Sequence, residues 1–165
     1  MLSKPFAGWT TITYEDFSED ISYLDDIPLD WTKAFEIYLE HIVKNDLVNI
    51  VPLSIIGDCE GYDLIIIATN YMLKMFTCEK SLETFNTNVF EFIQRICLDF
   101  IKDINEWTKW QVFDFECLDD GSLTQDSIDA MNKRKEEILG NIDRIRKLIH
   151  EISNHAYYQW IDVIL

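Results

Sequence analysis

The sequence predicts an α+β fold, in which a small antiparallel β-meander of about three to four strands packs against two long helices and a shorter N-terminal helix. β-branched and aromatic residues concentrate in residues 48–77, whereas apolar residues recur at helical spacing before and after this segment. The chain has 165 residues, and 48% of them are hydrophobic. This is enough for one domain with a hydrophobic core but too short for two domains of ordinary size. We therefore predict a single acidic α+β domain over residues 1–165.

The N-terminal region predicts one strand and one helix. Residues 9–14, WTTITY, are all β-branched or aromatic and predict a short strand. Residues 28–45 predict a helix, because Pro28 suits its first turn and Asp30 suits the positive end of its dipole. Apolar side chains recur at helical spacing on one face of this helix: Trp31, Phe35, Tyr38, Leu39 and Ile42.

The middle of the chain predicts the meander. Two β-prone runs, residues 50–56 and 62–69, are separated by the sequence GDCEG, whose glycines favour a hairpin turn. Pro52 predicts that the first run is an edge strand or starts late, because proline has no backbone N–H to donate to a neighbouring strand. Residues 71–76 predict a third strand after a tight turn, and residues 9–14 would extend the sheet to four strands.

Two long helices are predicted after the meander. Residues 82–110 predict the first, and residues 125–153 predict the second, with Ser122 or Thr124 as its cap. The last segment, residues 156–165, is too aromatic for a loose tail and is predicted to dock as a final strand or to close the core. The broad apolar stripe of the first long helix consists of Phe85, Val89, Phe92, Ile93, Ile96, Cys97, Phe100, Ile101, Ile104 and Trp107.

The net charge of −16 is concentrated at the N-terminal end of the chain. Residues 1–63 hold 13 acids and 3 bases, a net of −10, whereas residues 122–165 hold 7 acids and 6 bases, a net of −1. The densest stretch is YEDFSEDISYLDDIPLD at 14–30, with seven acids and no base. Such a surface repels nucleic acid and anionic membranes and attracts basic proteins or cations. The alternative interpretation is that the acids only keep an aromatic-rich, bacterial-type protein in solution.

The sequence predicts a cytoplasmic protein. The longest purely apolar run, LIIIA at 64–68, is far shorter than the roughly 20 residues of a membrane-spanning helix. The first residues lack the continuous apolar region of a signal peptide. Four cysteines without a CxxC pair are typical of reduced, mostly buried thiols: Cys59, Cys78, Cys97 and Cys117.

No catalytic residue, metal site or cofactor is predicted. The motifs GxGxxG, GxxxxGK[ST], GxSxG and HExxH are absent, and the acids of residues 14–30 do not follow the order of an EF-hand loop. Cys59 has three neighbouring carboxylates in the turn GDCEGYD, which disfavour the thiolate that a nucleophile requires. Glu151 and His155 are four residues apart and make only a weak zinc site without a third ligand.

Two arrangements of the acidic stretch remain open. Phe17, Ile21 and Leu24 have the spacing of a short amphipathic helix, which would bury them and turn the acids outward. The same three residues would otherwise pin an acidic linker to the core. Aromatic side chains among carboxylates favour protein binding, because the aromatics can anchor a partner while the acids steer it.

These features together predict a non-catalytic binding or inhibitor protein, with no family motif to place it. Small size, strong acidity and the lack of catalytic motifs are typical of immunity proteins and antitoxins, which neutralise a basic partner such as a nuclease toxin. A mimic of DNA that occupies a nucleic-acid-binding protein is a close variant. We expect no binding of nucleic acid or membrane, and the oligomeric state is left open.

Two other classes of function are kept as alternatives. One is a structural or scaffolding subunit whose aromatic tail pairs with a second copy. The other is a metal-dependent enzyme of unfamiliar type, centred on the Asp58–Asp63 turn or on Glu151 and His155. The predicted partner-binding residues are Glu15, Asp16, Glu19, Asp20, Tyr23, Asp25, Asp26, Asp30, Asp58, Glu60 and Asp63.

Overall fold

The computed structural model describes ten helices and strands, within residues 1–6, 9–15, 17–22, 27–45, 51–56, 64–69, 72–77, 83–110 and 122–165. They form an α+β fold of two antiparallel sheets and four helices, as the sequence predicts. In chain order the elements are β1 (Trp9–Tyr14), β2 (Phe17–Ser22), α1 (Ile27–Val43), β3 (Val51–Ile56), β4 (Leu64–Thr69), β5 (Met72–Thr77), β6 (Glu83–Asn88), α2 (Val89–Lys102), α3 (Ile104–Trp110) and α4 (Gln125–Ser153).

The larger sheet is a four-stranded meander in the order β3-β4-β5-β6. All its neighbouring strands pair antiparallel, which confirms the predicted meander. Pro52 lies on the edge strand β3, as predicted, and the register with β4 shifts between Pro52 and Ser54. The strand at 9–14 is also confirmed, but it pairs with β2 in a separate two-stranded sheet and does not extend the meander.

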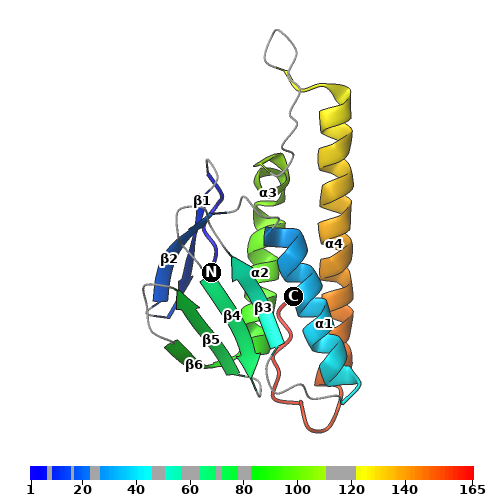
Figure 1. Ribbon diagram of the computed structural model, residues 1–165. Coiled ribbons are helices and arrows are strands. Elements are labelled where there is room, and N and C mark those ends of the chain that lie inside the picture. Colours follow the sequence, from blue (N-terminus) through cyan, green and yellow to red (C-terminus); the bar gives the residue numbers. More distant parts are fainter. Residues whose placement is uncertain are drawn as a thin grey trace.

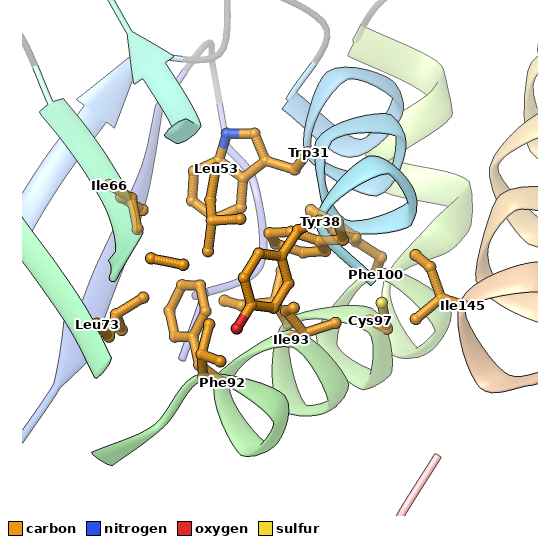
Figure 2. Packing of buried hydrophobic residues seen from close by; sticks show 14 of the residues in the cluster. Trp31, Tyr38, Leu53, Ile66, Leu73, Phe92, Ile93, Cys97, Phe100 and Ile145 are labelled. Carbon is orange, nitrogen blue, oxygen red and sulfur yellow. The ribbon is translucent and has the colours of Figure 1, made fainter. Parts of the chain in front are cut away.

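The elements are arranged in layers, with α1 and α2 between the sheets and α4 (Figure 1). Figure 2 shows how buried side chains of the meander, α1, α2 and α4 meet between these layers. Phe92 of α2 connects three elements, because its ring makes edge-on contacts with the rings of Tyr14 on β1 and Phe35 on α1. The ring centroids are 5.3 Å and 6.2 Å apart, respectively. The smaller sheet therefore belongs to the same packed core as the helices.

Helix α1 buries the face that the sequence predicts. The five predicted side chains, Trp31, Phe35, Tyr38, Leu39 and Ile42, are all buried. On its other side α1 packs along α4, with one buried polar contact between the two helices. Thr32 Oγ1 donates to the carbonyl of Pro28 at 2.7 Å and accepts from Asn141 Nδ2 at 2.9 Å. This contact satisfies both polar side chains inside an apolar interface.

The predicted helix over residues 82–110 is wrong at its start and interrupted near its end. Residues 83–88 form strand β6, and α2 begins at Val89 with Asn88 as its N-cap, whose Oδ1 accepts from the Phe90 N–H at 2.8 Å. Phe85 lies four residues before Val89, so it continues the helical spacing of α2 backwards into residues that form a strand. Helix α2 ends at Lys102, and α3 begins at Ile104, so only Asp103 separates the two helices.

Most of the predicted apolar stripe is buried across α2 and α3. Ile101 was predicted to belong to this stripe, but its side chain is 40% exposed. Phe100 packs edge-on against Trp107 at 5.3 Å, which joins the two helices across the interruption. The buried members are Val89, Phe92, Ile93, Ile96, Cys97, Phe100, Ile104 and Trp107, and the side chain of Phe85 lies outside the described residues.

Helix α4 has the predicted bounds, and Thr124 is its cap. Thr124 Oγ1 accepts from the Ser127 N–H at 3.3 Å. The apolar face of α4 is buried at Ile138, Ile142, Ile145, Ile149 and Ile152, and Leu148 is partly buried against the same core.

Gly140 in the middle of α4 provides a test of helix propensity. A Cβ added there would meet only Arg144 Nη1, at an ordinary contact distance of 3.8 Å. Gly140→Ala is therefore expected to raise the free energy of unfolding by about 0.5–1 kcal/mol, measured by urea denaturation. Ala130→Gly at an exposed position of the same helix is the matched control and should lower it by a similar amount. An unchanged or lower stability of Gly140→Ala would contradict this account of α4.

The C-terminal segment closes the core without forming a strand. Residues 156–165 follow α4, and Ile161 is buried. The side chain of Gln94 on α2 is fully buried and binds this segment through both ends of its amide. Its Nε2 donates to the carbonyl of Asp162 at 2.8 Å, and its Oε1 accepts from the N–H groups of Ile164 at 2.8 Å and Leu165 at 3.2 Å. The prediction that the segment closes the core is confirmed, and a final strand is wrong.

Candidate partner-binding surface

The β1–β2 hairpin has one buried face and one solvent-facing face. Thr10, Ile12 and Tyr14 of β1 lie opposite Ile21, Glu19 and Phe17 of β2. All of these except Glu19 are buried. Phe17 and Ile21 therefore anchor the acidic stretch to the core, as predicted, but they do so from a strand. A spacing of four residues places two side chains on one face of a helix and also on one face of a strand. Of the two arrangements left open for this stretch, the helix is therefore wrong for Phe17–Ser22.

Strand geometry also divides the acids of β2 between the two faces. Glu19 is half-buried and lies on the same face as Phe17 and Ile21, with Ile12 opposite. Asp20 points the other way and is exposed. The expectation that the acids of this stretch all turn outward is thus wrong for Glu19, because side chains alternate along a strand.

The solvent-facing side of the hairpin, called the hairpin face below, consists of Trp9, Thr11, Thr13, Ser18 and Asp20. Asp20 lies directly opposite Thr11 and accepts a hydrogen bond of 2.7 Å from its Oγ1. Trp9 starts the same face and is 37% exposed. A carboxylate, several hydroxyls and an aromatic ring therefore share one small exposed surface.

A second exposed aromatic side chain stands beside this face. Phe6 is 77% exposed and pairs with Trp9 through two backbone hydrogen bonds, of 2.9 and 3.0 Å. Residues 1–6 continue along β1, since Ser3 N–H donates to the Thr11 carbonyl at 2.9 Å. Phe6 and the exposure of Trp9 are not among the features predicted from the sequence. Strand alternation was the available signal, because Trp9 differs in parity from Ile12 and Tyr14.

Glu15 and Asp30 occupy the two ends of the described acidic stretch. Glu15 is exposed directly after β1 and has a φ of 51°, the left-handed region that hairpin turns between two strands require. Asp30 is exposed in the first turn of α1, where the helix dipole favours a negative charge. The other predicted partner-binding residues, Asp16, Tyr23, Asp25, Asp26, Asp58, Glu60 and Asp63, lie outside the described residues and stay predictions.

No group of three or more His, Cys, Asp or Glu side chains gathers in the described part of the chain to hold a metal ion. Burial raises the pKa of the Cys97 thiol, which therefore stays protonated. The predicted thiol character is confirmed for Cys97, which is free and buried. No helix among the described residues is long and apolar enough to cross a membrane.

Glu151 and His155, the pair considered as a weak metal site, line a common cavity with aromatic side chains at the end of α4. The geometry brings these two residues together but adds no third metal-ligating side chain from the described residues. Comparisons of the chain with models of protein families, with curated proteins and with solved structures found no significant match.

Proposed function

We propose that this protein is a non-catalytic binding protein of the immunity or antitoxin type, which neutralises a basic partner such as a nuclease toxin through its acidic N-terminal surface. The observation that carries the proposal is the charge of residues 5–32, which hold seven Asp and Glu and no Lys or Arg. The two flanking lysines form ion pairs with acids of other helices, Lys4 with Glu106 at 3.2 Å and Lys33 with Glu137 at 3.9 Å. Neither flanking lysine is thus left to neutralise the segment.

The composition of the hairpin face supports the same proposal. Exposed aromatic side chains at Phe6 and Trp9 offer area that a partner can bury, and aromatic residues are enriched among the side chains that dominate binding energy. Asp20 on the same face and Glu15 at its end add negative charge. Charge of one sign over a whole domain steers an oppositely charged partner and speeds its association.

The proposal is tested by affinity capture from cells of the source organism with the immobilised full chain, followed by mass spectrometry. Two variants with matched charge identify the surface. Each Asp→Lys or Glu→Lys change adds two charges, so four changes take the net charge from −16 to −8 in both variants. The N-terminal variant changes Asp16, Asp20, Asp25 and Asp26. The α4 variant changes Asp126, Asp129 and Glu136 on α4 and the exposed Asp162 after it, and it leaves Glu137, the partner of Lys33, unchanged.

We expect the unchanged protein and the α4 variant to retain the same basic protein, and the N-terminal variant to lose it. Far-UV circular dichroism should show that all three are folded. Retention by the N-terminal variant at physiological salt would contradict the proposal. Loss from both variants would also contradict it, because the interaction would then depend on total charge and not on this surface.

A further inference from the structure

A cavity of about 570 Å³ lies where the ends of α1 and α4 meet the C-terminal segment. Figure 1 shows these three parts gathered at one end of the molecule, well away from hairpin β1–β2. The volume is in the range of roughly 300–1,000 Å³ that is usual for pockets that bind small molecules. Apolar side chains of α1 and α4 form part of the wall, and the remaining lining includes Asn45, Glu151, His155, Tyr157, Tyr158 and Trp160.

The aromatic side chains of this cavity make packing contacts and hydrogen bonds, although two of them, Tyr157 and Trp160, are exposed. Tyr157 is 80% exposed. Its ring stacks on that of His155, with 5.5 Å between the ring centroids and an angle of 26° between the ring planes. Trp160 is 51% exposed, packs edge-on against Phe90 at 5.9 Å and donates from Nε1 to the Tyr157 carbonyl at 3.1 Å. Tyr158 makes a second edge-on contact with Phe90, at 6.5 Å. Three aromatic rings, each with a packing partner, thus line the cavity.

The charge of the cavity favours a cation. Glu151 is exposed at its rim, and no Lys or Arg of the described ranges forms an ion pair with it. The nearest lysines along the two helices are engaged elsewhere, Lys44 with Glu40 at 2.7 Å and Lys147 with Asp143 at 2.6 Å. Aromatic faces carry partial negative charge, so the rings and the carboxylate attract the same kind of group.

We infer that this cavity binds an organic ammonium group, with the cation over the faces of Tyr157, Tyr158 and Trp160 and its charge balanced by Glu151. The ammonium group belongs either to a free quaternary amine or to a lysine side chain of a peptide, since both present the same chemistry. This site is separate from the hairpin face and does not depend on the function proposed for it.

The test is isothermal titration calorimetry of the full chain with choline and with its neutral carbon isostere, 3,3-dimethyl-1-butanol. The two probes have nearly the same shape and differ in charge. Choline is expected to bind about tenfold more tightly than the alcohol, the amount that a partly desolvated cation–π site provides. Equal affinities of choline and the alcohol would overturn the inference.

Two substitutions then assign the contacts. Glu151→Gln keeps the shape of the side chain and removes its charge, and it should raise the Kd for choline about fivefold. Glu136→Gln, at an exposed position of the same helix, is the matched control and should leave the Kd unchanged. Trp160→Leu should raise the Kd at least about fivefold. An unchanged Kd in both cavity variants would overturn the site.

Two further probes distinguish the source of the cation. Nα-acetyl-lysine amide and its trimethylated form present the ammonium group on an amino-acid backbone. Tighter binding of either one than of choline would identify a lysine side chain as the ligand, and tighter binding of choline would identify a free quaternary amine. If neither amino-acid probe nor choline binds, the inference fails.

Discussion

Phe92→Ala is expected to lower the free energy of unfolding by about 3–5 kcal/mol, the range for truncating a fully buried phenylalanine. The side chain is 0% exposed. Its ring contacts Tyr14 of β1 and Phe35 of α1, so its removal leaves a cavity where three elements meet. The neighbours come from separate elements that are fixed by other contacts, which limits their collapse into the space.

Chemical denaturation followed by circular dichroism measures this loss. The control is Leu98→Ala on the same helix, where the side chain is 39% exposed, and its expected cost is below about 1 kcal/mol. If Phe92→Ala costs no more than Leu98→Ala, then α2 does not pack between the smaller sheet and α1 as the contacts of Phe92 require.

Gln94→Leu is expected to release the C-terminal segment and to cost about 2–3 kcal/mol. The substitution keeps a similar volume but removes all three hydrogen bonds to Asp162, Ile164 and Leu165. Their backbone groups would then lie against an apolar side chain, so they regain partners most readily by detaching into water. Because the detached backbone groups bind water, the loss in free energy of unfolding is limited to the packing of this segment.

Amide hydrogen exchange at Ile164 and Leu165 is the direct readout of this release. We expect protection at both positions in the unchanged protein and its loss in Gln94→Leu, while amides in the middle of α4 keep theirs. The affinity for choline should fall in the same variant, because Tyr158 and Trp160 belong to the segment. Retained protection at both amides would show that Gln94 does not hold the segment.

The sequence predicts those parts of the fold whose signals are local. The strand at 9–14 and the helix at 125–153 are found with their expected bounds, because an unbroken β-prone run and a capping threonine mark them. Strand β2 was missed because Phe17 and Ile21 are four residues apart, a spacing common to one face of a helix and one face of a strand. Strand β6 was missed because Phe85 lies four residues before Val89 and so continues the helical spacing of α2 backwards into residues that form a strand.

Tertiary contacts account for the rest of the fold. The course of residues 156–165 depends on the buried amide of Gln94, which is 68 residues away from its acceptor at Asp162. No periodic pattern within residues 156–165 could predict that Gln94 binds them. The cavity that Glu151 and His155 line together with the aromatic rings also depends on tertiary contacts. It forms only where the ends of two helices and the C-terminal segment meet.

The candidate surface could be predicted in charge but not in geometry. Asymmetry of charge is a property of composition, so the acidic N-terminal end is visible in the sequence. Which acids face outward depends on strand alternation, which separates Asp20 from Glu19. The exposed aromatic pair Phe6 and Trp9 depends on the path of residues 1–6 beside β1.

The most direct test of the proposed function is the dissociation constant of the captured basic protein for the two charge-matched variants at physiological salt. We predict that the N-terminal variant binds at least about 100-fold more weakly than the unchanged protein, because several like charges then face the partner. The α4 variant, with the same net charge, should stay within about threefold of the unchanged protein. Equal dissociation constants for the two variants would contradict the central claim that the acidic N-terminal surface is the interface.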